Sequence, residues 1–377
     1  MQISIISLSI TVSSVVSRVY APRDWMLSLP MAAIMLGMVV MTFPASAIFS
    51  RIGRKNGFVL GAITAICGAG LIALMMIASL WWGIIFGYFV VGLGLSAGTF
   101  YIYAANDGAP AEIGGRISGC ILLGGLLAAF IGPMAGHFAQ EIPTQTPLLA
   151  IPMMMIGFGL LVLLLILCLK TSPTQQAETQ SEPLKLSGMK RIMCSGHFWA
   201  AALVGSCGYG AMTLTMNATT PWMLDLRMGY HSVLAISFHL LGMFAPAPLS
   251  GWIADRFGAT FCGFLGFAMM VGCMVVLVLG REHTDFITAL ILLGIGWSMT
   301  MVAGTKKIVA LSKISDRAAC EAGSAVLISL ANVSAALSAG AIYINFGGQG
   351  VLLISSVFIV IGGIGLVAGM MLRSESV

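Results

Sequence analysis

Few ionisable side chains interrupt the long apolar segments of this chain, and one of them is a histidine. His239 lies nine residues into an apolar run that starts near residue 230, or about 13 Å along a helix at about 1.5 Å per residue. An imidazole gains and loses a proton near neutral pH. His239 is therefore a candidate proton carrier, and the alternative is a histidine that bonds a backbone carbonyl. Asp107, at the end of another apolar run, is the second proton-coupling candidate.

Polar side chains form a stripe on the first apolar segment. Ser4, Ser7, Thr11, Ser14 and Arg18 are spaced by 3, 4, 3 and 4 residues, which places all five on one face of a helix. A polar face in lipid needs a partner or water. The stripe predicts the lining of a cavity, and the alternative is hydrogen bonding between packed helices.

The composition decides what kind of protein positions these groups. Only 8% of the residues are charged and 59% are hydrophobic, whereas soluble domains have about 25% charged residues. The chain is therefore predicted to be an integral membrane protein. Its eight cysteines are scattered without C-x-x-C spacing, which argues against a metal or disulfide site. We expect no cofactor, and the net charge of +5 lies in short loops, which does not suggest nucleic acid.

Twelve membrane-spanning helices fit the apolar runs, since one span needs about 20 residues. The predicted spans are 2–19, 25–49, two within 56–106, 117–136, 147–169, 197–219, 230–253, 260–280, 286–305 and two within 322–372. The double runs are expected to break near 79–83 and 345–350. The polar stretch after residue 169 predicts a linker, so the expected organisation is a half over 1–169, a central loop over 170–196 and a half over 197–377.

Basic residues predict the orientation of the spans. If the loop at 50–55 is cytoplasmic, fourteen basic residues fall on the cytoplasmic side and four on the other. The four are Arg18, Arg23, Arg227 and Arg281. The excess predicts cytoplasmic amino and carboxyl termini.

Two short sequence patterns of the first half recur in the second half. "SAIFSRIGRK" at 46–55 aligns with "GWIADRFGAT" at 251–260, and "GLGLSAG" at 92–98 aligns with "GIGWSMT" at 294–300. Gly53 and Gly258 permit a tight turn between antiparallel helices. Asp255 can pair with a basic group on a neighbouring helix and so latch the cytoplasmic side.

This pattern resembles the major facilitator superfamily. The loop signature of that family is matched by Gly251, Asp255, Arg256 and Gly258 in the second half, and by Arg51, Gly53, Arg54 and Lys55 in the first. The resemblance implies an all-α membrane protein of twelve helices in two six-helix pseudo-symmetric halves, working by alternating access. Ser50 stands where the family carries the first-half aspartate, which puts that latch in doubt.

A second stretch, "AAFIGPMAGH" at 128–137, resembles the signature of antiporters in the same family. Gly132 and Gly136 allow close approach of helices, and Pro133 frees a carbonyl and kinks the helix. The resemblance implies an antiporter-like role, and the alternative is packing alone.

In this family the first, fourth, seventh and tenth spans line a central substrate site, which implies candidate lining residues here. They are Ser7, Thr11, Ser14, Tyr101, Tyr209, Asn217, Trp297 and Thr300. Aromatic side chains suit a planar or amphipathic ligand, or they pack against neighbours. The stretches 208–221 and 238–258 also resemble a bacterial branch of the family, some of whose members are expected to carry riboflavin-like vitamins. Lys306 and Lys307 depart from that branch.

We therefore expect a monomeric secondary active transporter in a bacterial inner membrane that moves a small organic molecule. Proton-linked efflux is the first hypothesis, and the alternative is uptake or facilitated entry of a nutrient such as a planar, riboflavin-like vitamin. An enzyme is disfavoured because the five histidines are far apart in the sequence. A sensor is disfavoured because the 22-residue polar stretch at 170–191 is too short for a signalling domain.

Overall fold

The computed structural model describes residues 2–101, 114–169, 194–311 and 317–374. Within these ranges the structure contains helices and turns and no strand. The chain divides into two compact units, Met1–Gln180 and Ser181–Val377. The predicted central loop lies almost wholly outside the described residues, so its boundaries remain a prediction.

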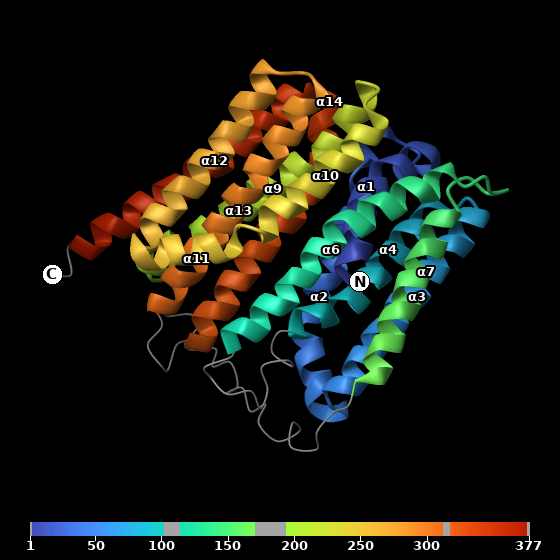
Figure 1. Cartoon of the computed structure of the whole chain (residues 1–377), viewed down its shortest axis with the longest axis horizontal. Helices are drawn as coiled ribbons and strands as arrows, with labels where there is room; N and C mark the ends of the chain where they lie inside the picture. Colours follow the sequence, from blue (N-terminus) through green and yellow to red (C-terminus); the bar gives the residue numbers. More distant parts are fainter. Residues whose placement is uncertain (1, 102–113, 170–193, 312–316, 375–377) are drawn as a thin grey trace. The chain divides into compact units, whose positions relative to one another are not determined.

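The first unit contains the helices coloured from blue to green in Figure 1. They are α1 (Gln2–Tyr20), η1 (Asp24–Met26), α2 (Leu29–Ile52), α3 (Arg54–Ile77), α4 (Trp81–Leu95), η2 (Ser96–Phe100), α6 (Gly114–Glu141) and α7 (Ala150–Cys168). The break expected near 79–83 lies between α3 and α4, where Ser79 has a φ of 54°.

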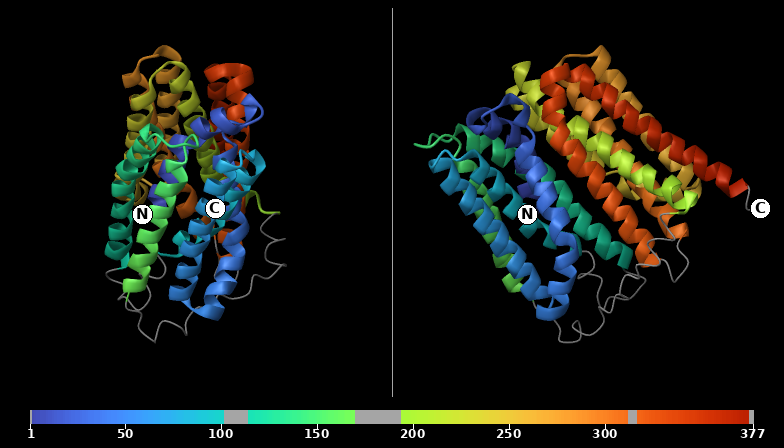
Figure 2. Two further views of the ribbon diagram at one scale, coloured as in Figure 1. Left: turned by 90° about the vertical axis from the view of Figure 1, so that its right-hand side faces the viewer. Right: turned by 180° about the vertical axis from the view of Figure 1, so that it is seen from behind.

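The second unit contains the helices coloured from yellow-green to red. They are α9 (Gly196–Asp225), α10 (Gly229–Phe244), α11 (Ala247–Arg256), α12 (Ala259–Leu279), α13 (His283–Leu311) and α14 (Arg317–Ser374). The predicted eighth span is split into α10 and α11 by the turn at Ala245 and Pro246. α14 is two helices that meet at Gly347, with φ of 63° and ψ of −169°, inside the break expected at 345–350. It runs beside α9 and α12 (Figure 2).

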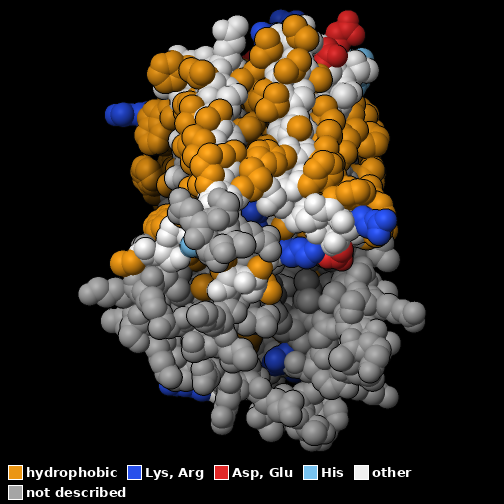
Figure 3. Space-filling view, turned by 90° about the vertical axis from the view of Figure 1, so that its left-hand side faces the viewer, with side chains coloured by type: hydrophobic (Ala, Val, Ile, Leu, Met, Phe, Trp, Pro, Cys, Tyr) orange, Lys and Arg blue, Asp and Glu red, His pale blue; other side chains and the backbone are white. Residues whose placement is uncertain are grey.

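The described part of the chain has the composition of membrane-spanning helices. Eight of its helical segments are long and apolar enough to cross a membrane. On the face shown in Figure 3, apolar side chains form a broad band, and charged side chains gather at its edges. The all-α, membrane-spanning fold class predicted from the sequence is confirmed.

The helix pairings of the first unit recur in the second. α2 packs against α4 as α10 packs against α13, and α3 packs against α4 as α12 packs against α13. α1 packs against α6 as α9 packs against α14. The internal repeat read from the sequence therefore corresponds to a repeat of helix packing.

Glycines make the closest of these contacts at equivalent positions. Gly37 and Gly92 bring α2 and α4 together, and a methyl group on either would collide with the backbone of the other helix. In the second unit, methyl groups on Gly242 and Gly294 would lie 2.8 and 2.5 Å from the carbonyl oxygens of Ile291 and His239. Small residues let helix backbones approach in lipid, where no hydrophobic force drives them together.

This packing predicts the effect of a single methyl group. Gly294→Ala should destabilise the protein by about 1–3 kcal/mol, because α10 and α13 must separate to make room. Gly363→Ala is the matched control, since no atom lies within 4 Å of the added methyl group there. The stability of each variant is measured by the thermal unfolding midpoint of the purified protein in detergent. Equal midpoints for the two variants would show that the close approach does not matter.

Candidate functional site

The two repeated loops turn in the same way. Gly53 has φ of 80° and ψ of 158° between α2 and α3, and Gly258 has φ of 94° and ψ of 152° before α12. A positive φ of this kind is unstrained only for glycine. The repeated glycines are thus explained by backbone conformation, whereas Gly251 lies beside open space.

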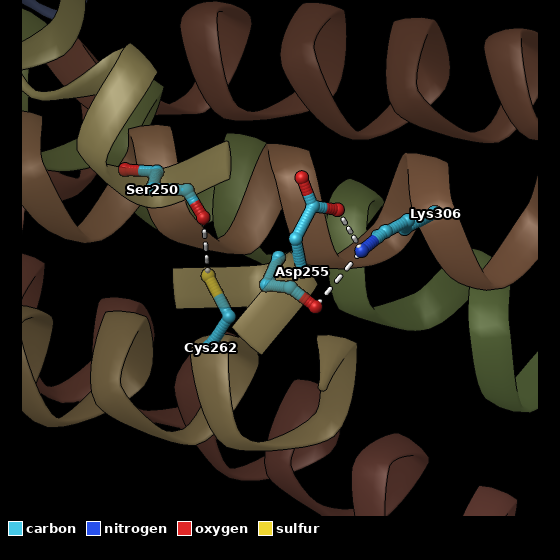
Figure 4. A network of polar contacts seen from close by, with 5 residues as sticks. Ser250, Asp255, Cys262 and Lys306 are labelled. Carbon is cyan, nitrogen blue, oxygen red and sulfur yellow. Dashed lines mark hydrogen bonds and ion pairs between the residues drawn. The ribbon is translucent and has the colours of Figure 1, made fainter. Parts of the chain in front are cut away.

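The side chain of Asp255 forms an ion pair with Lys306, which joins α11 to α13 (Figure 4). The ammonium of Lys306 also donates a hydrogen bond to the carbonyl oxygen of Ala254 at 2.9 Å. Beside the pair in Figure 4, the buried thiol of Cys262 contacts the carbonyl oxygen of Ser250 at 3.5 Å. The pairing of Asp255 with a basic group on a neighbouring helix, expected from the sequence, therefore has Lys306 as its partner.

The first loop makes a different contact. The ammonium of Lys55 donates to the carbonyl oxygens of Leu167 and Leu169 at 3.1 and 2.6 Å, at the carboxyl end of α7, where carbonyl groups lack helical partners. Arg51, like Arg256 in the second loop, is exposed. The lysine of this loop therefore stabilises a helix end of its own unit.

The antiporter-like stretch of α6 lies against the polar stripe of α1. The hydroxyl of Ser7 donates to the carbonyl oxygen of Ala128 at 3.0 Å, and Gly132 and Gly136 face α1 closely. Thr11 donates to the carbonyl oxygen of Ser7 at 3.0 Å within its own helix. Ser7 and Thr11 thus make hydrogen bonds to helix backbones, and the two glycines make close helix contacts, as the packing alternative predicts.

One residue of the predicted lining keeps an unused hydroxyl on α1. Ser14 is buried, and its hydroxyl has no hydrogen-bond partner among the described residues. Tyr101 lies elsewhere, edge-on to Phe58 with ring centroids 4.7 Å apart, beside an apolar cluster of α3 and α7. These positions do not bring Ser14 and Tyr101 into contact within the first unit.

An aromatic pair marks the second unit. Tyr209 on α9 and Trp297 on α13 meet edge to face, with ring centroids 5.4 Å apart. They are brought together at Gly208, where an added methyl group would lie 2.9 Å from the Cβ of Thr300. Thr300 itself donates to the carbonyl oxygen of Trp297 at 3.0 Å and is fully buried. It packs helices together and so positions the pair.

Buried polar atoms without partners lie on the same two helices. They are the indole Nε1 of Trp297, the amide oxygen of Asn217 and the hydroxyl of Thr220, each without a hydrogen-bond partner among the described residues. The amide nitrogen of Asn217 donates to the carbonyl oxygen of Thr213 at 3.0 Å, which fixes the orientation of the side chain. Because an unsatisfied buried polar atom is unfavourable, such atoms are candidates for contact with a ligand. Thr220 was not singled out by the sequence, although it lies three residues from Asn217 on the same helix face.

His239 is fully buried in α10. Its Nδ1 lies 2.8 Å from the carbonyl oxygen of Leu290, and because a carbonyl only accepts, Nδ1 carries the proton in that contact. Its Nε2 has no partner in the described part of the chain. One nitrogen therefore makes the structural bond considered from the sequence, and the other nitrogen is open; the proton-carrying role of His239 stays a prediction. Asp107 lies outside the described residues.

Comparison with known proteins identifies the family. The sequence model of the Major Facilitator Superfamily matches residues 3–305. The chain belongs to this superfamily. The family consists of transporters, so the chain is a membrane-spanning transporter, which supports the prediction that it is not an enzyme.

Two relatives and two solved structures are similar to this chain over most of its length. The riboflavin transporter RfnT of Brucella anthropi is 26% identical over 74% of this chain and 70% of its own. The transporter YddS of Bacillus subtilis is 25% identical over 88% of this chain and 79% of its own. A bacterial homologue of the human lysosomal transporter Spinster matches with a TM-score of 0.74 and 13% identity over 98% of this chain and 94% of that structure. The xylose transporter XylE from E. coli matches with a TM-score of 0.67 and 14% identity over 96% of this chain and 92% of that structure. At these identities, the two solved structures are evidence for the fold alone.

The ion pair of α11 and α13 leads to a prediction about Cys262. The experiment uses a protein in which Cys262 is the single cysteine. Asp255→Asn should raise the alkylation rate of this thiol by about 1.5- to 5-fold, because α11 is then held less tightly against α13. An exposed ion pair contributes about 0.2–1 kcal/mol. A membrane-permeant maleimide measures the rate. Lys306→Met should have the same effect, and the double variant should add little to it.

Arg256→Gln is the matched control, because it removes an exposed charge next to Asp255 without touching the pair. An alkylation rate that stays at the wild-type value in Asp255→Asn would mean that the ion pair does not hold α11 against α13.

Proposed function

We propose that this transporter carries a planar, uncharged molecule of the riboflavin type across the membrane by alternating access. The observation that carries the proposal is the Tyr209–Trp297 pair, whose indole N–H is buried without a partner among the described residues. The riboflavin transporter RfnT among the relatives supports the same substrate class. Uptake is the direction that fits a vitamin.

The chemistry of the second unit matches such a ligand. An aromatic side chain can pack face to face or edge to face against a tricyclic ring. The indole N–H of Trp297 can donate a hydrogen bond to a carbonyl oxygen of that ring. The free amide oxygen of Asn217 can accept from an imide N–H or from a hydroxyl of a sugar-alcohol chain. Tyr209 and Asn217 are eight residues apart on α9, about 12 Å along the helix, so a ligand with a ring and a polyol chain is long enough to reach both.

Proton-linked export of a small organic molecule is the second candidate. The observation that favours it is His239, which offers an unused nitrogen in the interior of α10. All carboxylates whose side chains are described lie within a few residues of a helix end: Asp24, Glu141, Asp225, Asp255, Glu282 and Asp285. Coupling away from the helix ends in the described part of the chain would therefore have to use His239.

The substrate proposal predicts binding that depends on the indole. Riboflavin should raise the unfolding midpoint of the purified protein, since a ligand at about 100 times its Kd adds about 2.7 kcal/mol. Trp297→Phe should weaken binding by about 2- to 13-fold, because it removes one hydrogen bond of about 0.5–1.5 kcal/mol, and Trp297→Ala should weaken it further.

Trp252→Phe, at an exposed position of α11, is the control and should bind as the wild type does. Absence of any shift with riboflavin would exclude the substrate class. A shift that is the same in the Trp297 variants would place the ligand elsewhere in the chain.

The export candidate predicts a pH effect. His239→Gln should abolish the dependence of transport on an imposed pH gradient in proteoliposomes, because glutamine cannot carry a proton. His137→Gln removes a histidine that contacts Glu141 at 3.3 Å near the end of α6 and should leave the dependence intact. A wild-type response in His239→Gln would remove His239 from the mechanism.

A further inference from the structure

One turn of α9, from Asn217 to Pro221, carries polar atoms that the helix itself does not use. Asn217 and Thr220 are 7% and 3% exposed. The amide oxygen of Asn217 and the hydroxyl of Thr220 have no hydrogen-bond partner among the described residues. Pro221 lies inside the helix and has no N–H to donate to the carbonyl oxygen of Asn217, four residues earlier. This buried turn, the Asn217–Pro221 turn, therefore offers three oxygen atoms without their usual partners.

The open hydroxyl is a property of Thr220 and not of every threonine on α9. A threonine within a helix commonly bonds a carbonyl oxygen three or four residues earlier. Thr219 does so, since its hydroxyl donates to the carbonyl oxygen of Thr215 at 2.7 Å. The hydroxyl of Thr215 in turn shares a hydrogen bond with that of Ser355 on α14 at 2.8 Å. The neighbouring hydroxyls are thus in use, whereas that of Thr220 is open.

The turn lies on the same face of α9 as the ring of Tyr209. At about 100° per residue, four residues fall within an arc of about 80°: Tyr209, Thr213, Asn217 and Thr220. Thr213 is already occupied, because its hydroxyl donates to Asn332 on α14 at 2.6 Å and its carbonyl oxygen accepts from the amide nitrogen of Asn217 at 3.0 Å. One helix face therefore presents an aromatic ring and, farther along, the open oxygens.

The register of α9 and α13 gives the distance from the aromatic pair to the turn. Two contacts set this register: Gly208 with Thr300, and Trp222 with Phe286. α13 therefore runs antiparallel to α9, and Trp297 is level with residue 211 of α9. Thr220 lies nine residues farther along, or about 13 Å. A ring that packs against Trp297 needs an extended substituent to reach Thr220.

The open atoms define the chemistry of that substituent. The two oxygens of Asn217 only accept hydrogen bonds, and the hydroxyl of Thr220 both donates and accepts. A hydroxyl group can donate to each of them, and a chain with successive hydroxyls can serve oxygens that are spread over one helical turn. A ligand without such a chain leaves these buried atoms unpaired, which is unfavourable.

We propose that the Asn217–Pro221 turn selects substrates that carry a hydroxylated chain on the planar ring. This inference rests on the proposed function, because it places the ring at the Tyr209–Trp297 pair. Thr220 is the specificity-determining residue: its hydroxyl exchanges hydrogen bonds with the chain, and the oxygens of Asn217 accept from neighbouring hydroxyls. A site built to bond a hydroxyl discriminates against the analogue that lacks it.

The test compares riboflavin with lumiflavin, which has the same isoalloxazine ring and a methyl group in place of the hydroxylated chain. Flavin fluorescence measures the Kd of each for the full chain, purified in detergent. The wild type should bind riboflavin more tightly than lumiflavin. Thr220→Val removes the hydroxyl at nearly constant size. It should weaken riboflavin binding by about 2- to 13-fold, the value of one hydrogen bond, and leave lumiflavin binding unchanged.

Three further variants separate the chain contact from the ring contact and from folding. Thr220→Ser keeps the hydroxyl and should bind both flavins as the wild type does. Thr219→Val is the matched control, because it removes a hydroxyl that is bonded within its own helix, and it should leave both affinities unchanged. Trp297→Phe acts on the ring and should weaken both flavins.

Three results would overturn the inference and leave the proposed function in place. Equal affinities of the wild type for the two flavins would show that the chain makes no favourable contact. An equal loss of both flavins in Thr220→Val would indicate a structural role. Unchanged riboflavin binding in Thr220→Val would assign the open hydroxyl to a buried water. Binding of neither flavin by the wild type would overturn the proposed function and this inference with it.

Discussion

Close approach of helix backbones at glycine is the constraint on which the second unit depends. Lipid provides no hydrophobic force between helices, so they associate through packing and through polar contacts. Gly294 on α13 lies against the carbonyl oxygen of His239 on α10, and that contact places the imidazole beside Leu290. Gly208 on α9 admits Thr300 of α13, and Tyr209 and Trp297 meet as a result. The candidate site residues are positioned by the same contacts that hold the helices together.

The two units share this scaffold and differ in the polar groups attached to it. The glycine turns have nearly the same φ and ψ, yet Lys55 binds the end of α7 while Asp255 binds Lys306. A turn needs glycine wherever the chain reverses with positive φ, so the glycine recurs. The partner of each charged side chain depends on which neighbouring helix ends close to the turn, and that helix differs between the two units.

The sequence predicted the helices, their order and two of their breaks, because length and polarity of an apolar run are enough for that. It missed the break between α10 and α11, although Pro246 and Pro248 were a signal for it. It indicated that Asp255 could pair with a basic group on a neighbouring helix, but it did not single out Lys306 as that group. The partner depends on the rotation of α13 about its axis, which the packing decides. Ser7 and Thr300 likewise have the polarity of a cavity lining, and only the structure shows the close contacts that they make with Gly132 and Gly208.

The distribution of charge in the described residues bears on which substrates the interior can accept. Lys55 and Lys306 are engaged at helix ends. Buried charge without a partner is strongly unfavourable, and every described carboxylate lies near a helix end, so the described interior offers an organic cation aromatic faces but no carboxylate. The buried groups that remain open among the described residues include indole N–H groups, amide oxygens, hydroxyls and a histidine nitrogen. These are partners for a neutral molecule rich in hydrogen-bonding groups, which favours a vitamin-like ligand over a cationic drug.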